Sequence, residues 1–299
     1  SHQKPVTYHL LHFLENQPVA ARFVFEARTR GATVISADHR VPPAPWFSDT
    51  FLPIRPGSQS ALLEGMLLHL LENRLCNTRF IEERTSGFEA FGKVMQKQSL
   101  KHCEGITGVP AAAIRDAAER YASARSSSLV LTADYNASPA NTCAALLHAA
   151  HLALVTGHLG RPGAGIFPLL TRGNEQGGYD MGMSPRMPFG QTDCADQAFS
   201  SRITRLWKIK HLPSKDGIPL EALPKAIKNH RIKAMYLMEA DPCTESSAAA
   251  EFQSSLKALD FLVVQDRFLT ETAKQADLIL PAPSWAEKAG TYTNTWTVT

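Results

Sequence analysis

The sequence predicts an α/β fold with mostly parallel sheets flanked by helices, and three observations support it. Short apolar runs rich in β-branched residues alternate along the chain with longer segments of helical apolar spacing. Several of these runs end at an acidic residue or a proline, as strand ends do in open sheets. The chain has 299 residues, which is enough for two domains with substantial cores.

Composition and charge favour a globular protein and exclude some partners. Apolar residues make up 44% of the chain and charged residues 20%, as in ordinary water-soluble domains. Lys and Arg total 31 against 28 Asp and Glu, so the net charge of +3 gives no reason to expect a nucleic-acid partner. No apolar run approaches the length of about 20 residues that spans a bilayer, so we expect no direct membrane insertion.

The five cysteines are scattered and include no CxxC pair. They are Cys76, Cys103, Cys143, Cys194 and Cys243. This pattern predicts free thiols in a reducing compartment, and therefore a cytoplasmic protein. It supplies no iron–sulfur or structural zinc site, because both need clustered thiolates.

The first half of the chain predicts four strands and a set of helices. Strands are expected at 8–14, 32–38, 51–55 and 129–134, and helices at 18–29, 59–73, within 80–105, from Pro110 onward, and at 141–156. Gly31 is a natural residue just after the end of a helix, and Ser58 is a natural N-cap. The broad apolar stripe of 59–73 indicates a core helix. His148 and His151 could bind a metal, but no third ligand follows, so we expect helix histidines with local partners.

Residues 157–190 carry nine glycines and four prolines, which predicts a long segment without regular structure. Such a segment is either an interdomain linker or a cradle whose backbone amides approach the phosphates of a cofactor. The polar residues 191–200 extend it as an exposed loop.

The last third alternates helix and strand again and ends in the stretch Phe261 to Asn294. FLVV predicts a strand covered on both faces, Thr270 a helix N-cap, and LILPAPS a second parallel strand. Ligands of open parallel sheets bind beyond the carboxyl ends of the strands, where Gln265, Asp266, Thr270 and Glu271 would lie.

A weak internal echo links the two halves. FEARTRGATVISADHR and FQSSLKALDFLVVQDR both predict a helix, an apolar strand and then an aspartate, which is Asp38 in the first and Asp266 in the second. An acidic residue at a strand end can accept hydrogen bonds from a ribose or a base edge, although a local capping role for Asp38 stays open. Two matching strand ends could hold two similar ligands.

The sequence resembles the large subunit of the molybdopterin oxidoreductase family, which contains molybdenum- or tungsten-dependent formate dehydrogenases, periplasmic-type nitrate reductases and the G subunit of NADH-quinone oxidoreductase. The matching segments, in order, include GATVISADHR, EGITGVPAAAIRDAAERYA, LALVTGHLGRPGAGIFP, NEQGGYDMG, IKAMYLMEADP and VVQDRFLTETAKQADLILPAPSWAEKAGTYTNT. The similarity is strongest to formate dehydrogenase α-subunits.

This resemblance implies two Rossmann-like α/β domains, 1–170 and 171–299, that clamp a bis(molybdopterin guanine dinucleotide) cofactor carrying Mo or W. Carried over by position, the cofactor-binding residues are Asn16, Asp38, Arg40, Gly57, Gln176, Gly177, Gln265, Asp266, Glu271 and Asn294. The resemblance places no catalytic residue and no metal ligand within this chain, and it places any iron–sulfur cluster outside it.

Three positions depart from the family pattern. His39 replaces a proline, and Gln59 stands where an acidic residue is common. Leu170 takes the place of an active-site arginine of formate dehydrogenases, with Arg172 two residues further on. Because formate needs a cation to bind productively, this last departure weakens a formate assignment.

Together these features predict a central fragment of a longer oxidoreductase, formate dehydrogenase-like, acting on a small molecule and working with other redox subunits of an electron-transfer complex. The alternative is a cofactor-free structural or electron-relay subunit that resembles the G subunit of NADH-quinone oxidoreductase. A plain nucleotide-binding module is a third hypothesis. The substrate, the electron acceptor and the oligomeric state stay open.

Overall fold

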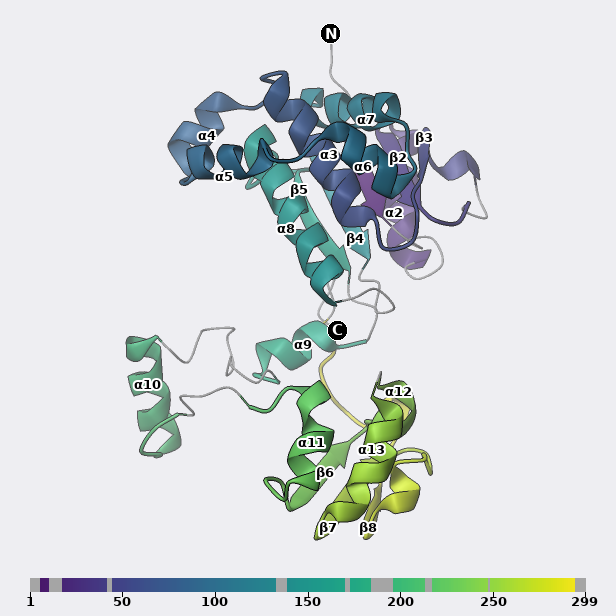
Figure 1. Cartoon of the computed structure of the whole chain (residues 1–299), viewed down its shortest axis with the longest axis vertical. Helices are drawn as coiled ribbons and strands as arrows, with labels where there is room; N and C mark the ends of the chain where they lie inside the picture. The colour runs from purple at the N-terminus through teal and green to yellow at the C-terminus, as the bar shows by residue number, and fades with distance from the viewer. Residues whose placement is uncertain are drawn as a thin grey trace. The chain divides into compact units, whose positions relative to one another are not determined.

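The computed structural model describes residues 6–10, 18–41, 45–132, 139–169, 173–183, 196–212, 217–246 and 248–293. The chain forms two compact units, which meet in the sequence between Glu175 and Gln176. Each unit contains one parallel sheet with helices around it (Figure 1). The predicted α/β class with parallel sheets is therefore confirmed.

The first unit is built on a five-stranded parallel sheet in the order β3-β2-β1-β4-β5. Its strands are β1 (Val6–Leu10), β2 (Thr33–Asp38), β3 (Thr50–Pro53), β4 (Ser127–Thr132) and β5 (Gly165–Leu169). Its helices are α2 (Pro18–Thr29), α3 (Gln59–Glu72), α4 (Thr78–Arg84), α5 (Phe88–Met95), α6 (Leu100–Thr107), α7 (Ala111–Ser123) and α8 (Pro139–Thr156), with a 3-10 turn at Pro45–Phe47.

Both faces of the first sheet are covered, which explains why its strands read as continuous apolar runs. Val34 and Val130 pack on the side of α2, in a small cluster with Val24. The neighbouring residues Ile35 and Leu129 point to the opposite face and join the main core. This alternation is the two-residue period of a strand.

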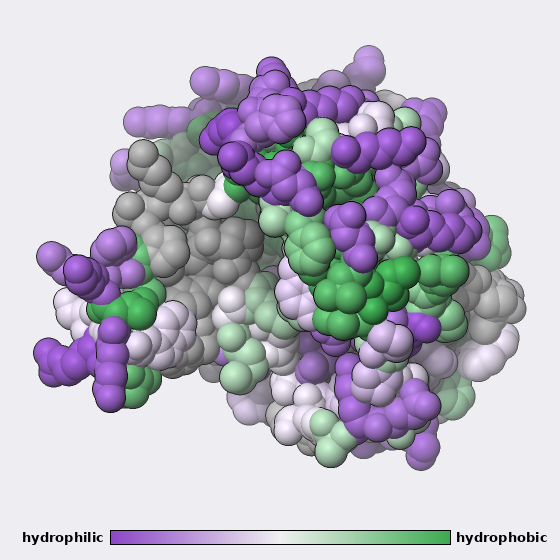
Figure 2. Space-filling view, turned by 90° about the horizontal axis from the view of Figure 1, so that it is seen from below, coloured by the Kyte–Doolittle hydropathy of each residue, from purple (hydrophilic) through white to green (hydrophobic). Residues whose placement is uncertain are grey.

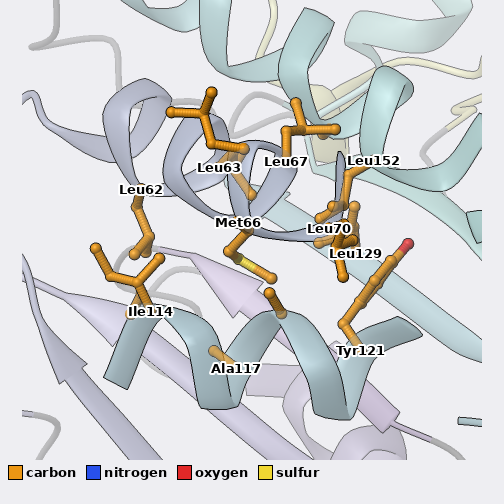
Figure 3. Close-up of a cluster of buried hydrophobic side chains, with 14 of the residues drawn as sticks. Leu62, Leu63, Met66, Leu67, Leu70, Ile114, Ala117, Tyr121, Leu129 and Leu152 are labelled. Atoms are coloured by element: carbon orange, nitrogen blue, oxygen red, sulfur yellow. The ribbon is translucent and has the colours of Figure 1, made fainter. Parts of the chain in front are cut away.

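Helix α3 lies at the centre of the main core, where it contacts α6, α7 and α8. Figure 3 shows Leu62, Met66 and Leu70 directed toward α7, whereas Leu63 and Leu67 point the other way. All five side chains are completely buried, so the predicted core helix is confirmed.

The two predicted helix boundary signals differ in outcome. Gly31 has φ +94°, and the bonds Gly31 N to Arg28 O and Ala32 N to Ala27 O close helix α2 as expected. Helix α3 begins after Ser58 as predicted, but the Ser58 hydroxyl donates to Arg55 O at 2.6 Å and does not cap the helix. The hydroxyl stabilises the preceding turn instead.

The second unit contains a three-stranded parallel sheet in the order β6-β7-β8. The strands are β6 (Ala234–Met238), β7 (Phe261–Asp266) and β8 (Leu278–Pro281). The helices are α9 (Glu175–Asp180), α10 (Gln197–Trp207), α11 (Leu223–Lys228), α12 (Pro242–Glu245) and α13 (Ala249–Ser255). Short 3-10 turns lie at Leu220–Ala222, Leu256–Ala258, Ala273–Gln275 and Trp285–Glu287.

The described residues cover only one face of the second sheet well, and within this part of the chain β7 is not buried on both faces as expected. Leu262 and Val264 pack against Phe252 in a core with α11 and α13. On the other face, Tyr236 of β6 is 52% exposed and Leu278 of β8 is 44% exposed. Figure 2 shows, in its view from below, a hydrophobic patch bordered by hydrophilic residues.

The same three-stranded arrangement occurs once in each unit. Strands β1, β2 and β3 have the lengths, order and register of β6, β7 and β8. The two sets are related by a constant offset of 228 residues, as from Asp38 to Asp266. The echo in the sequence is therefore a structural repeat.

An aspartate holds the second and third strands together at the start of each repeat. The Asp49 carboxylate accepts from Val34 N at 2.8 Å, and Asp49 N donates to Val34 O at 2.8 Å. In the second unit the Asp277 carboxylate accepts from Leu262 N at 2.7 Å, and Asp277 N donates to Leu262 O at 2.9 Å. This reciprocal pair fixes the register of both sheets.

The glycine-rich segment has more regular structure than its composition predicts. It contains strand β5, whose Phe167 and Leu169 pack against the cluster beneath α2, and it also contains the short helix α9. Helix α10 begins at Gln197, inside the predicted exposed loop. Glycines with positive φ at 157, 160 and 163 make the turns between α8 and β5.

Several smaller expectations concern single side chains. The four cysteines in the described part of the chain are free thiols. His148 is a satisfied helix histidine as expected, because its Nδ1 lies 3.1 Å from the hydroxyl of Ser60 on α3. His151 is not, since its Nδ1 is buried and has no partner among the described residues.

None of the helices in the described part of the chain has both the length and the apolar content to cross a membrane.

We predict that Gly157→Ala destabilises the first unit by about 1–2 kcal/mol, because a side chain disfavours its left-handed φ of +72°. A Cβ there would also lie 2.8 Å from Asn77 Nδ2. Gly92→Ala is the control, since no atom lies within 4 Å of its Cβ and it sits inside helix α5. Urea denaturation should show Gly92→Ala at or above wild-type stability, and equal effects of the two variants would contradict the prediction.

Candidate functional site

The carboxyl edge of the first sheet presents Asp38, the last residue of β2. Its carboxylate Oδ1 accepts from Arg40 N at 3.1 Å and lies 3.5 Å from His39 Nδ1. The Asp38 side chain is only 13% exposed. The turn after β2 therefore holds this carboxylate in a fixed position at the end of the strand.

A tight turn lies beside Asp38 because the next residue of the β3 segment, Ile54, donates its N–H to Asp38 O at 3.0 Å. Gly57 in this turn has φ +76°, a conformation that glycine adopts without steric cost. Arg55 is held away from the edge, because its N–H donates to Thr107 O and its guanidinium to Gly105 O. Gln59, the departure from the family pattern, is 7% exposed at the start of α3.

Asp266 repeats this geometry at the carboxyl edge of the second sheet. Its Oδ1 accepts from Phe268 N at 3.0 Å, and Ala282 donates its N–H to Asp266 O at 3.0 Å. Next to it, the Gln265 side-chain oxygen accepts a hydrogen bond from the Tyr236 hydroxyl. Gln265 and Asp266 thus share one strand end, as predicted.

The helix predicted after Thr270 is only a 3-10 turn at Ala273–Gln275, and its N-cap position is Thr272 rather than Thr270. The Thr270 hydroxyl nevertheless accepts from Ala273 N at 3.1 Å, at the start of that turn. Glu271 follows it in the same turn and pairs with Lys274. Both of those side chains are about half exposed, so this ion pair contributes little to stability.

Gln176 and Gly177 lie on α9 in the second unit. Gln176 donates to the Asp180 carboxylate at 2.8 Å, and Gly177 N lies 3.4 Å from Thr293 O. No hydrogen bond in the described part of the chain joins either residue to Asp266. Asn16, Leu170, Arg172 and Asn294 lie outside the described residues.

Sequence reasoning missed Asp241, which lies after β6 at the same edge as Asp266. Its Oδ1 accepts from the Thr272 hydroxyl at 2.5 Å and from Thr272 N at 3.2 Å, and its Oδ2 accepts from the Thr244 hydroxyl at 2.6 Å. Burial opposes the charge, but these hydrogen bonds outweigh it, so the pKa of Asp241 lies below its ordinary value. The signal was the Asp-Pro pair, since Asp241 precedes a proline at the first position of α12.

Glu239 was also missed. It has φ +47°, which is uncommon for a residue with a side chain and frequently marks functional sites. Its carboxylate lies 4.0 Å from Arg267 Nε and 3.7 Å from Lys288 Nζ. No sequence pattern predicts this conformation.

The described residues contain no cluster of three or more His, Cys, Asp or Glu side chains that could hold a metal ion. The two carboxyl edges instead offer carboxylates fixed by backbone N–H groups, amide oxygens and a glycine turn. Such groups can accept hydrogen bonds from the donor edge of a base or from sugar hydroxyls.

We predict that Asp241→Asn destabilises the second unit by about 1–2 kcal/mol at neutral pH, because it removes a charged acceptor. The folded pKa is depressed, so the stabilisation is complete above the ordinary value of 3.8 and is lost as the pH falls through the folded pKa. Urea denaturation from neutral to acidic pH should show the two proteins converging in acid. Asp260→Asn, at an exposed position, is the control, and a constant difference at all pH values would contradict the prediction.

Comparison with known proteins identifies a family and several relatives. The model of the molybdopterin oxidoreductase family matches residues 13–297. Similar relatives include F420-dependent formate dehydrogenase 2 subunit alpha of Methanococcus maripaludis, 34% identical over 286 residues, and formate dehydrogenase H of Escherichia coli, 32% identical over 283 residues. These alignments cover 94% and 93% of this chain but only 41% and 39% of the relatives.

The fold also matches a solved structure. Acetylene hydratase from Pelobacter acetylenicus superposes with a TM-score of 0.70 over 95% of this chain and 42% of the hydratase, at 21% identity. At that identity the likeness concerns the fold alone. The family match over nearly the whole chain and the relatives above 30% identity together show that this chain belongs to the molybdopterin oxidoreductase family.

Proposed function

We propose that this chain is the central part of a longer molybdenum- or tungsten-dependent oxidoreductase of the formate dehydrogenase type. In this proposal two cofactor-binding domains, which we place at 1–170 and 171–299, each bind one guanine dinucleotide arm of a bis(molybdopterin guanine dinucleotide) cofactor. The observation that carries the proposal is the repeated strand end of Asp38 and Asp266, with the same two backbone hydrogen bonds in each unit.

The chemistry of these strand ends fits the guanine end of the cofactor. Guanine presents two adjacent N–H donors, and a carboxylate with two oxygens can accept both. In each unit one carboxylate oxygen is held by the N–H two residues further along the chain, which orients the group before a ligand arrives. A guanine bound at such a preoriented group loses little additional conformational freedom.

Other residues at the edges would support the same ligand. The glycine turn at Gly57 would let the backbone approach a phosphate or ribose closely, and Arg40 supplies a positive charge next to it. Gln265 is oriented by Tyr236, and Glu271 could accept from a ribose hydroxyl. We also assign Asn16, Gln176, Gly177 and Asn294 to the cofactor site.

The cofactor supplies the redox chemistry at its metal, and this chain supplies position and electrostatics. The fixed carboxylates would anchor the two distant ends of the cofactor and so set the position of its central part. The metal ligand and any iron–sulfur cluster would lie in parts of the protein outside these residues.

The substrate and partners follow from the names of the relatives. Relatives named as formate dehydrogenases, some of them as subunit alpha of an F420-dependent enzyme, suggest formate as substrate and further redox subunits as partners. The free thiols of the described residues are compatible with the cytoplasmic location that we propose.

We predict that Asp266→Ala and Asp38→Ala in the full-length protein each lower retention of guanine nucleotide about tenfold or more, because each removes a charged acceptor. Asp260→Ala is the matched control, since this exposed aspartate precedes the amino end of the same strand β7. The measurements are metal content by elemental analysis and guanine nucleotide released on denaturation, with circular dichroism to establish folding.

Wild-type protein should contain Mo or W with two guanine nucleotides per metal ion, and Asp260→Ala should match it. Absence of both metal and guanine from properly matured wild-type protein would overturn the proposal in favour of a cofactor-free structural or electron-relay subunit. Unchanged guanine content in Asp266→Ala would remove that residue from the site.

A further inference from the structure

The first unit contains a polar pocket of about 390 Å³ at the amino edge of its sheet, opposite the edge that carries Asp38. Its walls come from the loop between α3 and α4, from the segment between α7 and β4, and from the segment between α8 and β5. Its polar lining side chains include Cys76, Asn77, Arg125, Thr156, His158 and Arg161. We propose that this pocket binds a small molecule through a phosphate-type oxyanion.

The charge of the pocket is positive. Arg125 and Arg161 both line it, and no Asp or Glu does. Neither arginine forms an ion pair within the part of the chain that the structure describes. Both arginines are exposed at the pocket wall, so their positive charges favour an anion in the pocket.

A buried histidine fixes the position of Arg161. The guanidinium Nη2 donates to His158 Nδ1 at 2.6 Å, while His158 Nε2 donates to Tyr121 O at 2.9 Å. The imidazole is 1% exposed and meets the Tyr121 ring edge to face at 5.1 Å. Arg161 is therefore held in place before any ligand binds.

The histidine stays neutral and so leaves the charge of Arg161 intact. Burial first, and then the positive charge of Arg161, lower the pKa of His158 to about 4. A neutral imidazole with its hydrogen on Nε2 accepts one N–H from the guanidinium, whose four remaining N–H groups can serve other acceptors.

Cations near helix C-termini usually cap the last carbonyl groups, but most of those groups at the end of α8 have other donors. The last carbonyl groups of α8 already have donors, because Leu152 O, Ala153 O and Leu154 O accept from Thr156, His158 and Gly157 respectively. Val155 O accepts from Asn77 N at 2.7 Å, and at the end of α7 Tyr121 O accepts from the Ser127 hydroxyl and from His158. The guanidiniums remain available to a ligand.

The donors and the size of the pocket select the ligand class. Planar guanidinium forks match the paired oxygens of a phosphate, and Asn77 and Ser123 add an amide and a hydroxyl donor at the wall. A volume of about 390 Å³ lies at the lower end of small-molecule pockets. Burial raises the pKa of the Cys76 thiol, which favours its neutral form, so this lining residue adds no negative charge to the pocket.

The test is isothermal titration calorimetry of the full-length protein with inorganic phosphate and with phenyl phosphate, at constant ionic strength set with sodium chloride. We expect saturable binding, weakened about tenfold to a hundredfold in Arg125→Gln and in Arg161→Gln, since each removes charged hydrogen bonds. Arg115→Gln, an exposed arginine of α7 outside the pocket, is the control and should bind as wild type does.

Arg125→Gln leaves the pair of Arg161 and His158 intact, so it separates loss of the ligand from local misfolding, and circular dichroism checks both variants. Tighter binding of phenyl phosphate would identify a phosphorylated small molecule as the ligand, and equal binding would identify free phosphate. Absence of saturable binding by either anion at millimolar concentration, or equal binding by all variants, would overturn the proposal. Neither result bears on cofactor retention, which depends on the opposite edge of the sheet.

Discussion

The reciprocal hydrogen bonds of Asp49 with Val34 and of Asp277 with Leu262 set the geometry on which both sheets depend. Side chains alternate along a strand, so a slip of one residue would turn every apolar side chain to the wrong face. These aspartates lie at the amino end of the third strand of each repeat and lock it to the second strand. Because the register is fixed there, the second strand ends at Asp38 in one unit and at Asp266 in the other. The aspartate clamp at the amino edge thereby helps to set the position of the proposed ligand-binding carboxylate at the carboxyl edge.

Outside the repeated strands β1–β3 and β6–β8, the two units differ in structure. The first has two further strands beside β1 and a large core around α3, whereas the described part of the second has three strands with one well-covered face. The residues after the repeated aspartate differ as well. His39 and Arg40 follow Asp38, whereas Arg267 and Phe268 follow Asp266. The two strand ends are equivalent, but the residues that follow them differ. The two candidate sites can therefore hold similar groups next to different side chains.

Much of the fold was predictable because local signals agreed with tertiary packing. Helix α2 runs from Pro18 to Thr29, as apolar spacing and Gly31 predicted, and β2 ends at Asp38. The failures have physical causes. Strand β5 was missed because an edge strand with one neighbour needs little apolar sequence. Its Leu169 is buried, and its Phe167 partly buried, by residues distant in the chain. The Ser58 hydroxyl donates to Arg55 O in the preceding turn and does not cap helix α3. The spacing of residues in the sequence does not distinguish these two roles.

The placement of the candidate residues was predictable for the same reason. Gln265 and Asp266 lie at one strand end as expected, because a parallel sheet places its strand ends together. Asp241 escaped because its role depends on Thr272, which lies 31 residues away in sequence. Gln176 was expected beside the cofactor, and its side chain bonds Asp180 in the described structure. Contacts between distant residues carry no local sequence signal.

The carboxyl edge of the first sheet presents a hydrogen-bond acceptor and its amino edge presents hydrogen-bond donors. This difference follows from the direction of the strands and helices. At the carboxyl edge Asp38 is presented with backbone N–H groups, which suits a ligand that donates hydrogen bonds. At the amino edge the helices α7 and α8 end, and their carbonyl groups are satisfied by His158, Asn77 and short polar side chains. The arginines at that edge are thus left for a ligand that accepts hydrogen bonds. In a parallel sheet the covering helices run antiparallel to the strands, so the carboxylate acceptor and the arginine donors lie at opposite ends of the strands. A ligand that donates hydrogen bonds and a ligand that accepts them can therefore bind the same unit without competing.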